Sequence, residues 1–89
     1  MPTETFTAKI QQNRRIQIPV LLRWRYKLNL GIVLKIEIVR TSPLKKTRFY
    51  ARLQKSGRVT IPKLTAETTQ LNKGDVVEVT VWIQQPSIV

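Results

Sequence analysis

The sequence contains no cysteine and no histidine among its 89 residues. Disulfide bonds are therefore excluded, and so are the usual zinc sites, which need thiolate or imidazole ligands. The five acidic residues form no close pair and no metal-ligand spacing, and no glycine-rich phosphate loop is present. We therefore expect a protein that is not an enzyme, that needs no cofactor and that has no small-molecule substrate.

Long hydrophobic stretches are also missing. No apolar run approaches the ~20 residues of a membrane-spanning helix. The first five residues, MPTET, lack the basic and apolar regions of a secretory signal. We therefore expect a cytoplasmic protein without a membrane partner.

Negative charge is scarce, because 16 Lys and Arg face only five Asp and Glu, which gives a formal net charge of +11. On a domain this small, such a charge creates a strong positive potential and favours a polyanionic partner. Up to Pro43 the chain carries 8 − 2 = +6, and after it 8 − 3 = +5. The charge is thus spread over the whole chain and does not form a detachable basic tail.

What the sequence does contain is a repeat, because residues 6–39 recur 43 positions later without a gap. The matching pairs include Phe6 and Phe49, Arg15 and Arg58, Ile18-Pro19 and Ile61-Pro62, Leu28-Asn29 and Leu71-Asn72, and Gly31 and Gly74. A copy of about 35 to 40 residues seldom forms a sufficient core without a disulfide or metal. The two copies must therefore share one core, and a closed pair with pseudo-two-fold symmetry is the simplest arrangement.

Each copy shows the same succession of elements. Alternating apolar residues predict two strands joined as a hairpin, a proline opens a short helix, and a further alternating strand follows. In the first copy these elements span residues 5–11, 15–18, 20–27 and 32–40. The second helix is rich in threonine, so we expect it to be short or irregular. The whole predicts one domain over 1–89, with repeats at 5–40 and 48–83, a linker at 41–47 and a tail at 84–89.

The repeated unit resembles a known family. The segment GRVTIP at Gly57 to Pro62, followed by Gly74-Asp75 and the alternating strand VVEVTV, is similar to the AbrB/SpoVT/MazE-like swapped-hairpin pattern. The first copy matches this pattern at Arg15, Ile16, Ile18-Pro19, Arg23, Leu28 and Gly31. The resemblance covers most of the chain. It implies a mainly β fold with short helices, in which two interleaved ββαβ repeats form one swapped-hairpin barrel as a single-chain pseudo-dimer.

The two copies depart from the family pattern at different positions. Arg14 replaces the turn glycine in the first copy, where the second copy keeps Gly57. Ala66 replaces the helix arginine in the second copy, where the first copy keeps Arg23. The replacement at Ala66 would weaken any DNA contact through the second helix.

Members of this family bind DNA, so the resemblance implies contacts by basic side chains at the matching positions. Arg15 and Arg58 follow the two turns and alternate outward, toward phosphates or guanine edges. A hairpin between the first two strands of each copy places Lys9 and Arg52 on the same faces. With the turns and the first helix included, the candidate DNA-binding residues are Lys9, Arg14, Arg15, Arg23, Arg52, Lys55 and Arg58.

Several of these side chains have a second interpretation. Arg14 and Lys55 lie in the turns, where they could contact phosphates. Arg23 could extend the basic surface or brace the fold by bonding turn carbonyls. Trp24 and Tyr26 could stack on bases, but we favour packing in the core or in an interface.

We therefore expect a protein that binds double-stranded DNA, either as a transcriptional regulator or as a nucleoid or chromatin architectural protein. It would be a monomeric pseudo-dimer that could associate further. Two alternatives stay open. One is an antitoxin-like module that binds a protein partner, and the other is an RNA-binding protein.

Overall fold

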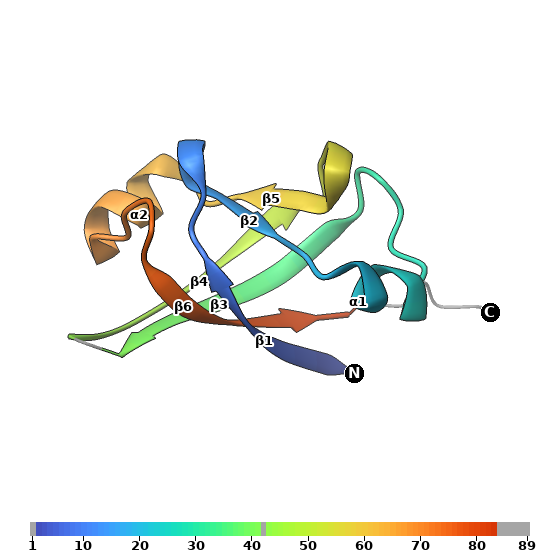
Figure 1. The fold of residues 1–89 in the computed structure, drawn as a ribbon, viewed down its shortest axis with the longest axis horizontal. Coiled ribbons are helices and arrows are strands. Elements are labelled where there is room, and N and C mark those ends of the chain that lie inside the picture. Colours follow the sequence, from blue (N-terminus) through green and yellow to red (C-terminus); the bar gives the residue numbers. More distant parts are fainter. Residues whose placement is uncertain (1, 42, 84–89) are drawn as a thin grey trace.

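The computed structural model describes residues 2–41 and 43–83 (Figure 1). The predicted tail at 84–89 lies outside the described residues, and so does Ser42 of the predicted linker. The described elements, with two short 3-10 turns called η1 and η2, are β1 (Thr3–Lys9), η1 (Gln12–Arg14), β2 (Arg15–Gln17), α1 (Val20–Arg25), β3 (Val33–Thr41), β4 (Leu44–Arg52), η2 (Lys55–Gly57), β5 (Arg58–Thr60), α2 (Lys63–Thr69) and β6 (Val76–Trp82). No helix among them is long and apolar enough to cross a membrane.

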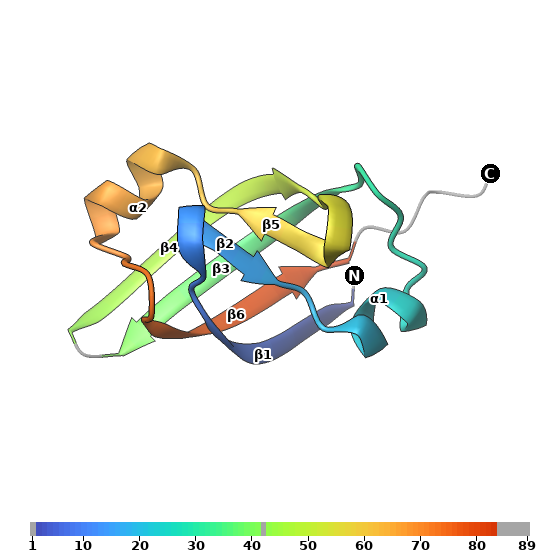
Figure 2. The ribbon, with the colours of Figure 1, turned by 45° about the horizontal axis from the view of Figure 1, so that its top comes forward.

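The strands form two antiparallel layers. A four-stranded sheet has the order β1-β6-β3-β4, and a two-stranded ribbon pairs β2 with β5. Figure 2 shows the ribbon lying across the sheet, with α1 and α2 at opposite ends of the molecule. The prediction of a mainly β fold with short helices is confirmed.

Pairing joins the two halves of the chain. Strand β1 runs along β6, with Phe6 opposite Val79, and β2 runs along β5, with Ile16 opposite Val59. Strand β3 also pairs with β6. Each layer therefore takes strands from both halves, and neither half completes a layer alone.

The predicted hairpins within each copy are wrong. Between β1 and β2 the only ladder contact is the isolated bridge from Gln11 to Arg15, and Gln54 and Arg58 form the equivalent bridge. Strand β1 instead pairs over seven residues with β6, whereas β2 offers only three residues for pairing. Each residue pair in a ladder satisfies backbone hydrogen-bonding groups and brings side chains into contact. Pairing of β1 with β6 is therefore more favourable than pairing with the shorter β2.

The predicted linker at 41–47 is largely strand. Thr41 ends β3, and β4 begins at Leu44, the residue opposite it in the ladder. Strand β4 then pairs along the full length of β3, as far as Arg52 opposite Val33. The second half therefore starts with a nine-residue strand, four residues earlier than expected. Helix α2 spans seven residues, so it is short, as expected, although it is one residue longer than α1.

The core between the two layers is apolar. Among the described residues no polar or charged side chain is fully buried. Ile16 and Ile18 from one half, and Val59 and Ile61 from the other, are inaccessible to solvent and belong to the same cluster as the inward residues of the sheet. Burial of each such side chain contributes about 1.5–3 kcal/mol. This burial fixes which ribbon residues face outward.

Candidate nucleic-acid interface

The outward side of the ribbon, with the turns that lead into it, forms a surface that we call the ribbon face and define as residues 11–17 and 54–60. Because successive side chains in a strand alternate, the neighbours of buried Ile16 and Val59 point away from the core. The ribbon face contains four basic residues and no acidic one. The basic residues are Arg14, Arg15, Lys55 and Arg58.

Three of these cations meet at one place. Arg15, Lys55 and Arg58 line a hollow of about 370 Å³, together with Gln54 and Ser56. The first comes from one half of the chain and the other two come from the second half, so the pairing of β2 with β5 creates this cluster. Guanidinium and ammonium groups are the donors that bind phosphate oxygens most strongly.

Hydrogen bonds orient one of the two central arginines. The Nε of Arg58 donates to Oε1 of Gln17 at 3.3 Å, and Nε2 of Gln17 donates to the Ser56 carbonyl at 2.7 Å. Arg15 lies opposite Thr60, whose hydroxyl donates to Oε1 of Gln54 at 2.8 Å. The two sides of the ribbon therefore present different polar groups around equivalent arginines.

Three carboxylates form salt bridges with arginines outside the ribbon face. Glu37 accepts a bond from Arg48 at 2.7 Å, Asp75 lies 3.7 Å from Arg40, and Glu4 lies 3.5 Å from Arg25. No described salt bridge includes a residue of the ribbon face. Its positive charge is therefore not neutralised by direct pairing within the described chain.

Arg14 and Arg23 have internal partners. The Nε of Arg23 donates to the carbonyl of Ile18, and the Nε of Arg14 donates to the carbonyl of Ile61, each at 3.1 Å. Ile18 and Ile61 occupy equivalent positions in the 43-residue repeat. Each of the two equivalent carbonyls therefore accepts a hydrogen bond from a different guanidinium. For Arg23, this bond is the contact with a backbone carbonyl that the bracing interpretation predicts.

Lys9 and Arg52 do not join the ribbon face. They end β1 and β4, which are the two outer strands of the four-stranded sheet, so they lie at its opposite edges. The Nη1 of Arg52 donates to the carbonyl of Gly31 at 3.2 Å. The placement of Lys9 beside Arg15 is wrong because the hairpin on which it depended does not form.

The aromatic side chains lie elsewhere. Trp24 is 73% exposed, so it does not pack in the core, and packing of Trp24 in an interface stays a prediction. The Tyr26 hydroxyl donates to Oε2 of Glu4 at 2.6 Å, and this bond, together with desolvation and the Glu4 charge, raises the tyrosine pKa above its ordinary value of 10.0 against an opposing effect of Arg25. Trp82 has Lys35 and Arg48 over its ring.

Sequence reasoning missed a second basic cluster. Arg40, Lys63 and Lys73 line a hollow with Arg14 at the other side of η1. These residues belong to the end of β3, the start of α2 and the loop before β6. No spacing in the sequence links them, because only the fold brings the three elements together.

Among solved structures, the chain is similar to "The solution structure of PHS018 from pyrococcus horikoshii". The two are 30% identical, the match covers 88% of this chain and 87% of that chain, and the TM-score is 0.80. The likeness thus extends over nearly the full length of both chains, in sequence as well as in fold. No family model and no curated protein matches the chain.

Proposed function

The chain belongs to the same family as PHS018 from Pyrococcus horikoshii, and for this member of the family we propose that it binds double-stranded DNA through the ribbon face. One observation carries the proposal: Arg15, Arg58 and Lys55 border a single outward hollow. The absence of acidic residues from the ribbon face supports it, and so does the net charge of +11. Such a surface attracts the phosphate backbone from a distance and binds it on contact.

We also propose that the fold is an AbrB-like swapped-hairpin barrel made of two interleaved ββαβ repeats. Three observations support this: the 43-residue repeat, the pairing of β1 with β6, and the pairing of β2 with β5. A barrel of this kind with both repeats in one chain is a pseudo-dimer. Its central pair, Ile16 opposite Val59, lies at the middle of the ribbon.

In this proposal, phosphate contacts supply most of the affinity, while Arg15 and Arg58 also reach toward base edges. Cations neutralise phosphates and release counterions, so binding weakens as salt rises. With roughly six phosphate contacts, log K falls against log salt with a slope of about −5. The protein would act in the cytoplasm on the nucleoid, as a transcriptional regulator or as an architectural chromatin protein.

The decisive experiment reverses the two central charges of the ribbon face. We expect Arg15→Glu with Arg58→Glu to abolish duplex binding in a gel-shift or fluorescence-anisotropy titration, because each substitution replaces a phosphate donor by a repelling carboxylate. Both side chains face outward, so circular dichroism should show a folded protein. The net charge falls from +11 to 11 − 4 = +7.

A matched control separates the effect of changing the ribbon face from the effect of lowering the net charge. Lys27→Glu with Lys46→Glu also gives 11 − 4 = +7, but both lysines are exposed and lie outside the ribbon face. We expect this variant to keep most of the duplex affinity at physiological salt. Equal weakening in both variants would reduce the interaction to non-specific charge, and full binding by the folded ribbon-face variant would reject the proposed surface.

Two further measurements define the partner. Competition between duplex DNA and RNA should favour DNA, and a clear preference for RNA would replace the proposal. Affinities for many duplex sequences should then separate the two roles. A specific-to-non-specific ratio near one indicates an architectural protein, and a ratio of about 10³ or more indicates a regulator.

A further inference from the structure

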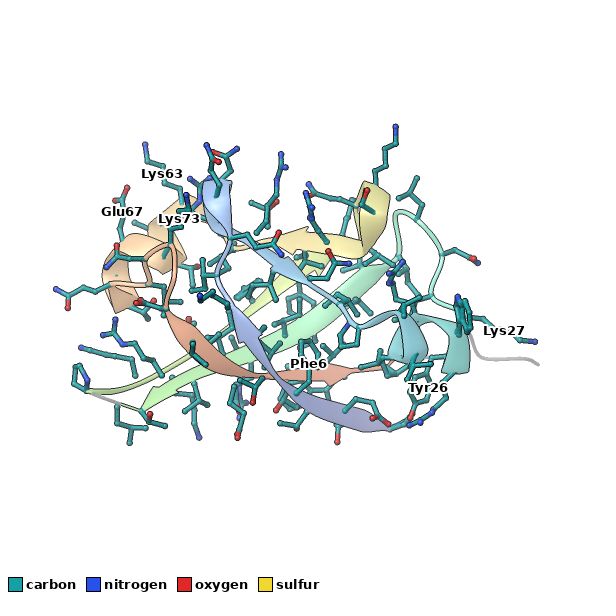
Figure 3. The ribbon with its side chains drawn as sticks, viewed as in Figure 1. Phe6, Tyr26, Lys27, Lys63, Glu67 and Lys73 are labelled. Carbon is teal, nitrogen blue, oxygen red and sulfur yellow. The ribbon has the colours of Figure 1, made fainter. Side chains whose placement is uncertain are left out.

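The second hollow lies between η1 and α2, and it has a volume of about 830 Å³. Four of its lining residues are basic and one is acidic. Figure 3 shows Lys63, Lys73 and Glu67 at the α2 end of the molecule, beside η1. The basic residues are Arg14, Arg40, Lys63 and Lys73, and the acidic residue is Glu67. The hollow therefore carries an excess of positive charge.

Arg40 has a donor that the described chain does not satisfy. Its Nη1 group donates to the Gln70 carbonyl and lies 3.7 Å from Oδ2 of Asp75, and its side chain is only 14% exposed. Its Nε, in contrast, is buried and has no hydrogen-bond partner. Nearly all buried polar groups in proteins have such a partner, either another protein group or an ordered water. Arg40 thus borders the hollow with a guanidinium whose donors are only partly satisfied within the described chain.

The junction between the ribbon and the following helix differs between the two ends of the molecule. Around Ile18, the Arg23 side chain covers Gly57 so closely that a Cβ on that glycine would meet Cζ, Nε and Nη1 of Arg23 within 2.6 Å. Around Ile61, the helix carries Ala66 in place of this arginine, and Arg14 supplies the guanidinium from the turn. The short Ala66 side chain lines the hollow and leaves the space between α2 and η1 open.

We propose that this hollow binds a phosphate group, with Arg14, Arg40, Lys63 and Lys73 as its donors. Two guanidinium groups and two ammonium groups provide hydrogen bonds and charge for a tetrahedral oxyanion, as phosphate sites require. The phosphate belongs either to the backbone of a bound nucleic acid or to a free phosphate compound. The site shares residues 11–14 with the ribbon face, but it does not depend on DNA binding through Arg15 and Arg58.

The first test is an NMR titration with inorganic pyrophosphate, compared with sodium chloride at equal ionic strength. We expect pyrophosphate to shift the Arg40 Nε–H signal, because the charge of the anion lies beside this guanidinium. The backbone amides of Arg14 and Lys73 should shift with it, and those of Lys55 and Arg58 should shift less. Equal shifts over all basic surfaces, or an unchanged Arg40 signal, would overturn the proposal.

The second test removes the two exposed lysines. Lys63→Gln with Lys73→Gln should weaken pyrophosphate binding about tenfold, because two charge-assisted donors are lost. The control Lys27→Gln with Lys46→Gln removes the same charge from other exposed positions and should weaken binding less than about twofold. Equal effects of the two variants would show attraction by net charge alone and would reject a site.

A third measurement identifies the source of the phosphate. If Lys63→Gln with Lys73→Gln also weakens duplex binding, and pyrophosphate competes with the duplex, the group is a backbone phosphate. If duplex binding is unchanged, the ligand is a free phosphate compound, and the site stands in either case. The Arg15→Glu, Arg58→Glu variant keeps all four donors, so its pyrophosphate binding reports on the hollow even if the proposed DNA contact fails.

Discussion

At the scale of single residues, the two halves satisfy equivalent backbone groups by different means. Arg23 reaches the Ile18 carbonyl from a helix, and Arg14 reaches the Ile61 carbonyl from a turn. Each arginine stands where the other half has a residue with a short side chain or none, Ala66 and Gly57 respectively. The substitutions therefore compensate each other, since each junction between ribbon and helix keeps one guanidinium.

This arrangement predicts the cost of filling Gly57. Its φ of +75° disfavours any side chain, and the added Cβ of Gly57→Ala would displace Arg23 from the Ile18 carbonyl. We expect a loss of about 2–4 kcal/mol in the free energy of unfolding, from about 1–2 kcal/mol of backbone strain and a lost hydrogen bond to a charged group. Chemical denaturation measures this loss.

Gly74→Ala is the matched control. Gly74 has a φ of +91° and no atom within 4 Å of an added Cβ, so this variant contains the backbone strain without the displaced arginine. We expect a loss of about 1–2 kcal/mol. If the two variants lose the same stability, Arg23 does not brace the junction.

At the scale of elements, local patterns predict strands better than they predict partners. Alternation located β1, β2, β3 and β6, because burial on one face leaves a signal in every strand. Alternation cannot show which strand pairs with which, because any strand of similar length with an apolar face can be the partner. Proximity along the chain favoured a hairpin of β1 with β2, but β6 offers the longer ladder.

A contact between two elements, the bond from Tyr26 after α1 to Glu4 in β1, predicts a pH dependence. The bond to the Glu4 carboxylate raises the pKa of Tyr26 above 10.0, so the neutral phenol is favoured in the folded state. The stabilisation is therefore complete below about pH 10 and disappears as the pH rises through the raised pKa. Ultraviolet titration of tyrosinate, with Tyr26→Phe to assign the signal, measures this value. In Glu4→Gln the pKa should fall toward 10.0, and an unchanged value would contradict the bond.

At the scale of the whole molecule, the interleaved layers predict what cleavage does. Strands β1 and β2 have their partners in β6 and β5, beyond a cut between Ser42 and Pro43. We expect fragments 1–42 and 43–89 to be unfolded as separate monomers, because neither closes the core. Mixed in equal amounts, they should regain the circular dichroism and thermal transition of the intact protein. A cooperative transition in a monomeric fragment would show that a half folds alone.

The repeat is also the reason why the class of fold, but not the whole site, was predictable. Two short copies without cysteine or histidine have to share a core, which predicts one domain, and the alternating strands predict that it is mainly β. Alternation alone predicts that Arg15 and Arg58 point outward, next to the buried Ile16 and Val59. The hollow around Arg40 and Lys63 could not be predicted, because it depends on where the end of β3 meets α2.

The covalent link between β3 and β4 also has a genetic consequence. In a homodimer, one codon specifies both ends of the assembly, so a substitution that opens a hollow at one end opens it at the other. Here each end has its own codon, as Ala66 and Arg23 illustrate. The protein therefore has two chemically different ends, and the proposed complex with a duplex would exist in two distinguishable orientations.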